Sequence, residues 1–368
     1  MNATHAPVDL DDPDGLQAAD RNGLLWSAAM AGAQVRSTAA ALDEGVLDPL
    51  RSDERPRTVI WVAGRGAAES AGSMLAAAMA SSAAAPMVVL PEAPPWLGAL
   101  DVVVVAGDDP GDPALVSAAA TSVRRGCRLA VVAPYEGPLR DAAAGRSVVL
   151  APRVQVPDDF ALCRYLAAGL AIMDCVDPRM RTDLSALADD LDAEALRNSV
   201  GRESFVNPAK TLADRMLGRA VVLAGDNAAT LALARHGAAI MLRVAHQPVA
   251  ATCLADVLVA LHGGLGVSSG ARSQSSIFHD EQIDGPLPPR VRSFVLTTGA
   301  DRPVVAARVG GFDDVDIIDA EDVPDAVAAA DEVPAGAPTP SAGRLEQQLA
   351  RLAVRLEMTA VYLRLVRG

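Results

Sequence analysis

One short pattern occurs twice in this chain, near the start of each half. An apolar run ending in glycine, Arg57–Gly64, is followed by an alanine-rich segment at residues 67–81. The same order recurs about 161 residues later, where Arg219–Gly225 precedes an apolar segment at residues 227–243. A continuous apolar run is typical of a strand buried on both faces of a parallel sheet, and a repeat of this length indicates two similar units. The pattern therefore predicts two related halves of the α/β class.

Further apolar runs continue the alternation of strands and helices through both halves. Strands separated by helices predict parallel sheets covered on both faces. The expected strands are 58–63, 87–90, 101–106, 128–132 and 147–150 in the first half, and 220–225, 249–252, 292–297 and 314–318 in the second. The expected helices of the first half are 67–81, 112–125 and 158–174.

Changes in composition suggest the domain boundaries. The predicted order is an N-terminal helical arm (1–56), a first α/β domain (57–175), a helical connector (176–218), a second α/β domain (219–330), a linker (331–343) and a C-terminal helix (344–368). We expect this last helix to be amphipathic, and His236 to lie at a surface or interface. The apolar side of the C-terminal helix would carry Leu345, Leu349, Leu352, Leu356, Ala360 and Leu363.

Composition argues against several classes of protein. The net charge is −14 with no dense basic run, which does not suit nucleic-acid binding. No apolar run reaches the roughly 18–20 residues that span a bilayer, and residues 1–14 do not resemble a signal peptide. The four cysteines are far apart, which predicts neither a zinc site nor a disulfide scaffold. A cytoplasmic protein without a metal or other cofactor is expected.

Five motifs follow one another along the chain: Leu10–Asp20 with Gly23, Val62–Gly72, Ala151–Arg153, Phe278–Gly285, and Leu356–Leu365 with Tyr362. In this order they resemble the sugar isomerase (SIS) domain proteins. The resemblance is strongest to the bifunctional phosphoglucose/phosphomannose isomerases, in a divergent actinobacterial branch. It implies two three-layer αβα sandwich domains, a homodimer, and a phosphorylated hexose or related small anion as ligand.

The resemblance places a phosphate-binding loop at Val105–Pro113, but this loop is acidic. Gly107 is retained, whereas Asp108, Asp109 and Asp112 stand where the family has hydroxyl side chains. Carboxylates within about 5 Å of a phosphate dianion would repel it by several kcal/mol at intermediate dielectric. Asp112 is instead explained as the N-cap of the following helix.

The catalytic groups implied by the resemblance are also altered. Arg243 stands where the family has its glutamate base, and an arginine cannot act as a base at neutral pH. The histidine position falls on Val259 or Ala260, with His262 nearly a full helical turn away. Glu69 and Asp226 remain as candidates for a relocated base. The basic residue of the family's Pro-Arg step is retained as Arg153.

The Gly64–Gly66 turn still has small residues where the protein backbone would have to approach a ligand. A tight strand-to-helix turn needs glycine in any case, so the turn alone does not establish a site. His279–Glu281 fits a solvated loop better than a metal site. The candidate substrate-binding residues are Gly64, Arg65, Gly66, Ser70, Gly107, Arg153, Arg243 and Arg272, the last in a loop at residues 263–276.

Three functions remain open from the sequence. The first is a sugar-phosphate-binding protein with degenerate catalytic motifs. The second is an active aldose–ketose isomerase with a relocated base. The third is a scaffold or interaction protein without a ligand. The acidic loop and Arg243 favour the first and the third, while retention of both halves favours a ligand.

Overall fold

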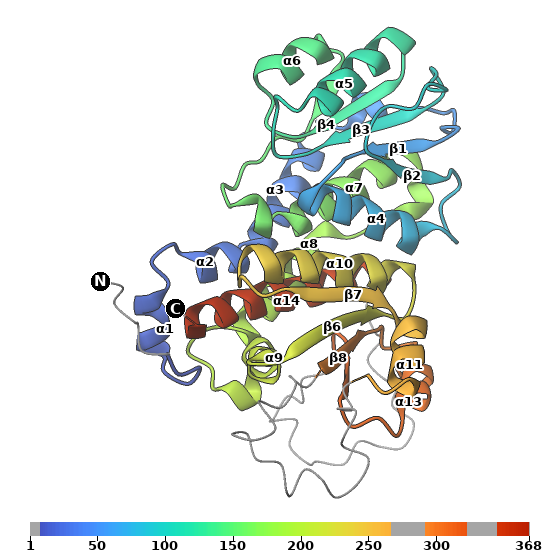
Figure 1. Ribbon diagram of the computed structural model, residues 1–368. Helices are drawn as coiled ribbons and strands as arrows, with labels where there is room; N and C mark the ends of the chain where they lie inside the picture. The colour runs from blue at the N-terminus through green and yellow to red at the C-terminus, as the bar shows by residue number, and fades with distance from the viewer. Residues whose placement is uncertain (1–7, 266–290, 322–343, 368) are drawn as a thin grey trace, which may run out of the picture. The chain divides into compact units, whose positions relative to one another are not determined.

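The computed structural model describes residues 8–265, 291–321 and 344–367 (Figure 1). Contacts divide the chain into two compact units. The five-strand unit contains Asn22–Arg197 and Leu345–Glu357. The four-strand unit contains the described parts of Met1–Arg21, Asn198–Arg344 and Met358–Gly368. Among the described helices, none has the length and apolar character of a membrane span.

The sheet of the five-strand unit is entirely parallel, in the order β2-β1-β3-β4-β5. Every residue of β1 and β3 is buried, as their continuous apolar sequence predicts. The observed bounds lie close to the predicted ones. They are β1 (Val59–Val62), β2 (Met87–Leu90), β3 (Val102–Ala106), β4 (Arg128–Val132) and β5 (Ser147–Val149).

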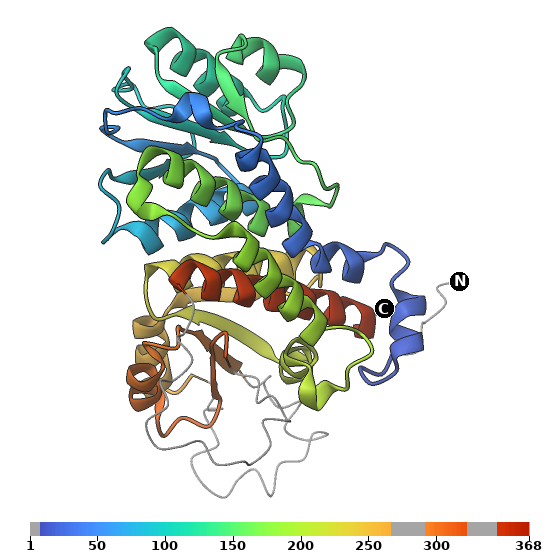
Figure 2. The same ribbon diagram turned by 180° about the vertical axis from the view of Figure 1, so that it is seen from behind.

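Helices cover both faces of this sheet. Figure 1 shows α5 and α6 on one face and α4 and α7 on the other, and each pair is in contact. From behind, α3 packs beside α7 and α8 (Figure 2). This is the predicted three-layer αβα arrangement. The helices are α2 (Leu24–Ala29), α3 (Ala31–Asp43), α4 (Gly66–Met79), α5 (Pro113–Arg125), α6 (Gly137–Ala143), α7 (Leu162–Val176) and α8 (Leu184–Arg197).

The four-strand unit repeats the design with a parallel sheet in the order β7-β6-β8-β9. Its strands are β6 (Ala220–Gly225), β7 (Val249–Cys253), β8 (Val291–Leu296) and β9 (Val315–Ile318). Apolar side chains of β6 and β8 form a core with α11 and α13. The helices of this unit include α1 (Pro13–Ala19), α9 (Pro208–Met216), α10 (Ala228–Arg243), α11 (Leu254–His262) and α13 (Arg302–Val309).

The C-terminal helix α14 (Leu345–Arg367) does not have one buried and one exposed face, so the prediction of an amphipathic helix was wrong. It is buried on nearly all sides from Gln348 to Leu365, and even Arg355 and Glu357 are only 1% exposed. The apolar spacing identified the helix but could not show that its polar positions are also enclosed. His236 is likewise buried rather than at a surface.

Candidate functional site

The five-strand sheet has a topological switch point at its centre. The chain places β2 on one side of β1 and then β3 on the other, so the carboxyl ends of β1 and β3 flank the point of reversal. Open parallel sheets bind ligands in the crevice at this position. The two loops that begin there are Gly64–Gly66 and Gly107–Asp109, so the structure brings these two sets of predicted residues to one edge.

The turn after β1 supplies the cationic side chain of this edge. Arg65 is 61% exposed, and its guanidinium lies 3.2 Å from the carboxylate of Asp108 and 4.0 Å from that of Asp109. Gly66 has a φ of 69°, a conformation that favours glycine. The turn itself therefore accounts for this glycine, and Arg65 is the group that a ligand could use.

The other two polar candidates of α4 are engaged within the helix. The Ser70 hydroxyl donates to the carbonyl oxygen of Gly66 at 3.2 Å. The exposed Glu69 carboxylate accepts from the Ser73 hydroxyl at 3.3 Å. Both side chains are thus hydrogen-bonded to other residues of α4 and not to the loop after β3.

Each carboxylate of the acidic loop has a partner. Asp112 caps α5 by accepting from the backbone amide of Ala114 at 2.8 Å, which confirms its predicted role. Asp109 accepts from the amide of Gly111 at 2.8 Å. Asp108 pairs with Arg65. The loop is thus stabilised by its own chain, and the pair between Asp108 and Arg65 crosses the switch point.

Asp158 is a residue of this edge that sequence reasoning missed. It begins the 3₁₀ helix Asp158–Phe160, and its carboxylate accepts from the Tyr165 hydroxyl at 3.2 Å and lies beside the backbone amide of Ala67 at the start of α4. Burial raises the pKa of Asp158, and the nearby carboxylate of Asp108 raises it further. A carboxyl group with a raised pKa at this edge of the sheet is a candidate functional group.

The raised pKa gives a pH-dependent prediction. Unfolded aspartate titrates at about pH 3.9, so between that pH and the higher folded pKa the folded chain binds more protons and loses stability as the pH rises. Asp158→Asn removes this loss. We expect the variant to gain stability over the wild type at neutral pH, with the gain vanishing below about pH 4. Urea unfolding across this pH range measures it, and a variant that is less stable at neutral pH would contradict the assignment.

Arg153 lies beyond β5 and is already paired. Its guanidinium donates to both oxygens of Glu44, at 2.8 and 2.5 Å. This bidentate contact lowers the pKa of Glu44. The predicted basic residue is therefore held by a carboxylate of its own unit.

The four-strand unit has a corresponding switch point between β6 and β8. Asp226 follows β6, and its two carboxylate oxygens accept from the hydroxyls of Thr230 and Thr297, both at 2.6 Å. The side chain thus bridges the two strand ends, and both of its oxygens have donors. Asp226 is therefore not placed as a base that is free to take a proton from a ligand.

Arg243 lies far from Asp226. Asp226 precedes the first residue of α10 and Arg243 is the last. A helix of 16 residues is about 24 Å long at roughly 1.5 Å per residue. The two predicted residues therefore lie at opposite ends of the helix, and they cannot act on one small ligand within this unit.

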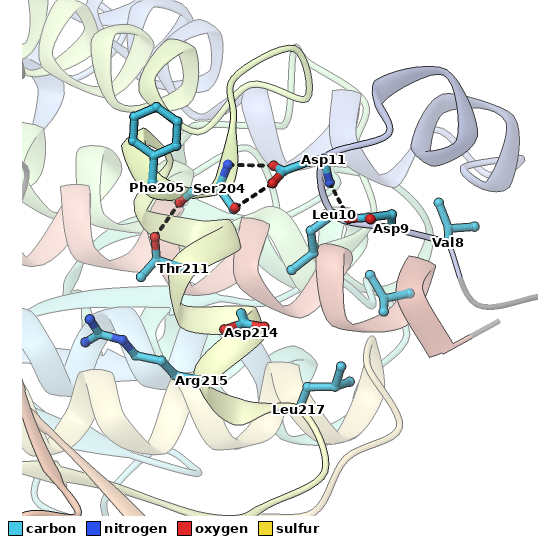
Figure 3. A pocket seen from close by; sticks show the side chains of 11 residues that line it. Val8, Asp9, Leu10, Asp11, Ser204, Phe205, Thr211, Asp214, Arg215 and Leu217 are labelled. Atoms are coloured by element: carbon cyan, nitrogen blue, oxygen red, sulfur yellow. Dashed lines mark hydrogen bonds between the residues drawn. The ribbon is translucent and has the colours of Figure 1, made fainter.

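A pocket of about 570 Å³ lies in the four-strand unit, lined by residues other than those of its switch point (Figure 3). The Asp11 carboxylate accepts from the backbone amide and hydroxyl of Ser204, at 2.7 and 2.8 Å, and these bonds lower its pKa. Leu217 precedes the amino end of β6. The pocket contains none of the predicted site residues, and its acidic lining does not suit an anion. Its lining residues are Val8, Asp9, Leu10, Asp11, Ser204, Phe205, Thr211, Asp214, Arg215, Leu217 and Val366.

Some sequence predictions lie outside the described residues. These are Arg272, His279–Glu281 and the Phe278–Gly285 motif. Within residues 8–265, 291–321 and 344–367, no group of three or more histidine, cysteine, aspartate or glutamate side chains is arranged to hold a metal ion.

Known proteins resemble this chain in structure and not in sequence. No protein-family model and no curated protein matches the sequence. A putative phosphosugar isomerase from Clostridium difficile 630 superposes with a TM-score of 0.61 at 11% identity, covering 94% of this chain and 93% of its own. Tagatose-6-phosphate ketose/aldose isomerase from Escherichia coli gives 0.60 at 14% identity, covering 99% and 96%.

A glucose-6-phosphate isomerase-like protein from Thermus thermophilus gives a TM-score of 0.51 at 19% identity, with 98% of this chain and 96% of the other covered. All three superpositions extend over both units, so the likeness is one of the whole architecture. Identities this low establish the fold and leave the chemistry of each site open. The chain has the two-domain α/β fold of the phosphosugar isomerases.

Proposed function

We propose that this protein binds a phosphorylated sugar, or a related small anion, at the β1–β3 switch point and has little or no isomerase activity. The observation that supports this most is Arg65, an exposed cation at the position where open parallel sheets bind ligands. Its ion pair with Asp108 is solvent-accessible, and such pairs contribute only about 0–1 kcal/mol. A phosphate dianion can therefore replace Asp108 as the partner of Arg65, provided that the accessible side chains of Asp108 and Asp109 turn away from it, since they would otherwise repel it.

The loss of isomerase activity is proposed from the state of the candidate bases. An aldose–ketose isomerase needs a carboxylate that can take a proton from carbon. Asp226 has a hydroxyl donor on each oxygen, and Glu69 is exposed on the surface of α4. Arg243 occupies the position that the resemblance assigns to the base. These features favour binding without turnover.

A second candidate function is isomerisation with Asp158 as the base. This carboxyl lies at the same edge, and burial raises its pKa toward the range in which carboxylates transfer protons effectively. Its contacts with Tyr165 and with the amide of Ala67 hold it in place at the start of α4. Turnover that is lost in Asp158→Asn would establish this alternative.

A thermal-shift screen tests the binding proposal. Glucose 6-phosphate, mannose 6-phosphate and fructose 6-phosphate would be compared with unphosphorylated glucose. A ligand at 100 times its Kd stabilises the folded state by about 2.7 kcal/mol, and Arg65→Gln is expected to lose most of this shift. An interconversion assay on the same samples is expected to give a rate well below about 1 s⁻¹. No shift with any phosphorylated sugar would leave the scaffold function instead.

The proposed setting is the cytoplasm, with the protein acting as a homodimer. The low count of cysteines and the fold of the phosphosugar isomerases support this setting. Light scattering coupled to gel filtration measures the assembly directly, and a monomeric mass would contradict the dimer.

A further inference from the structure

The five-strand unit contains a second, smaller cavity of about 150 Å³. It opens beyond the carboxyl ends of β4 and β5, at the same edge of the sheet as the β1–β3 switch point but two strands along. Its walls come from α3, from α7 and from the segment that follows β5. The lining includes Ser37, Thr38, Leu150, Ala151, Arg153 and Arg164.

Arg164 is the unusual member of this lining. It is only 7% exposed, and its Nη1 atom is buried with no hydrogen-bond partner among the described residues. Buried charges in proteins are normally paired, because an unpaired one carries its full desolvation cost. The buried Arg355 shows the usual situation, since it donates to the Glu194 carboxylate at 2.8 Å. Arg164 lacks such an acceptor at Nη1.

The neighbours of Arg164 compensate for its charge in part. Its guanidinium stacks over the Tyr165 ring at 4.0 Å, which is a favourable cation–π contact. The charge also acts on Asp158, whose carboxylate is already held by the Tyr165 hydroxyl. Neither interaction provides an oxygen for Nη1. The hydroxyls of Ser37 and Thr38 are uncharged and both donate to the carbonyl of Gln34, so they do not balance the charge of Arg164.

A second guanidinium lines the same cavity. Arg153 is 42% exposed and is held by Glu44, whose side chain is 54% exposed. Because this pair is accessible to water, an incoming anion can compete with Glu44 for Arg153. The cavity therefore offers one free buried donor and one exchangeable cation.

We propose that this cavity binds one tetrahedral oxyanion, either inorganic phosphate or the phosphate group of a small ester. The anion would accept hydrogen bonds from the guanidinium groups of Arg164 and Arg153, and Arg164 would turn its unpartnered Nη1 toward it. A cavity of about 150 Å³ is large enough for benzene, so it admits a phosphate group but not a whole phosphorylated hexose. The site is separate from the β1–β3 crevice and does not depend on sugar-phosphate binding there.

Inorganic phosphate is the probe for the test. Thermal unfolding of the full chain would be followed as phosphate replaces chloride at constant ionic strength. The wild type is expected to unfold at rising temperature with phosphate, and Arg164→Met to lose that response while remaining at least as stable without phosphate, because an unpaired buried charge is removed. Arg128→Met is the matched control, since Arg128 is a half-buried arginine at the amino end of β4 that donates to the carbonyl of Leu50.

A second variant keeps the test decisive if Arg164→Met does not fold. Glu44→Gln frees Arg153 and is expected to tighten phosphate binding several-fold. These variants are also compared in the Arg65→Gln background, which removes anion binding at the switch point. There, no phosphate response, a response retained on adding Arg164→Met, or an unchanged affinity on adding Glu44→Gln would each overturn the proposal. Titration with glucose 6-phosphate separates the two sources of phosphate. A shift with the sugar phosphate is expected to survive in Arg164→Met, because the whole sugar phosphate binds at the β1–β3 switch point and not in this cavity. If Arg164→Met removed the response to both ligands, the claim of two separate sites would be overturned.

Discussion

Glu194→Gln is expected to lower the free energy of unfolding by about 3–5 kcal/mol, because it removes the negative charge from a buried group of arginines. Glu194 lies on α8 with a side chain that is 0% exposed. Its carboxylate accepts from Arg355 at 2.8 Å and from Arg197 at 2.9 Å, and Arg351 lies 3.9 Å away. Glutamine keeps the shape of the side chain and leaves these guanidinium groups without this charge.

The same helix provides a control for this variant. Asp189 pairs with Arg36 on the exposed side of α8, and both side chains are accessible to solvent. Asp189→Asn is therefore expected to change stability by less than about 1 kcal/mol. All three tryptophans, Trp26, Trp61 and Trp96, belong to the five-strand unit, so fluorescence during urea unfolding reports on the unit that contains Glu194. Equal effects of the two substitutions would contradict the importance of the buried charge.

Gly225→Ala is expected to destabilise the protein by about 3 kcal/mol, at the upper end of the usual cost of overpacking. Gly225 is the last residue of β6, and the chain turns directly into α10. A Cβ atom on Gly225 would collide with the backbone nitrogen and Cα of Leu231 and would lie 2.5 Å from the carbonyl carbon of Thr230. Backbone atoms cannot move aside as a flexible side chain can, so the turn itself must open.

Gly64 is the repeat counterpart of Gly225 and serves as its control. A Cβ atom on Gly64 would meet nothing closer than the Pro91 Cβ at 3.7 Å, which is an ordinary contact. Gly64→Ala is expected to leave stability unchanged or raise it by up to about 1 kcal/mol, because alanine restricts the unfolded chain. Circular dichroism during unfolding compares the two variants. A Gly64→Ala variant as unstable as Gly225→Ala would contradict the difference between the two turns.

The fold could be predicted because its strands are buried on both faces. In β1 and β3 this burial requires every position to be apolar, and the resulting runs are visible in the sequence. The repeated glycine turn revealed the two sheets. Short helices such as α6 escaped notice because seven residues carry little periodic pattern.

The candidate site could be predicted only where a contact is local. The N-cap at Asp112 depends on an amide two residues away and was predicted correctly. The pair between Arg65 and Asp108 joins loops 43 positions apart, and only the parallel pairing of β1 with β3 places them together. Asp158 was missed for the same reason. Its place after Ala151–Arg153 and at the start of a helix was visible, but its approach to α4 was not.

Saturation-transfer NMR on one sample of glucose 6-phosphate and the wild-type protein tests the central claim most directly. The spectrum reports binding through the sugar signals that receive saturation, and it reports turnover through the appearance of fructose 6-phosphate. We predict transfer to glucose 6-phosphate that is strongly reduced in Arg65→Gln, with no fructose 6-phosphate formed. Conversion of the sugar, or the absence of any transfer in the wild type, would contradict a protein that binds phosphorylated sugars without isomerising them.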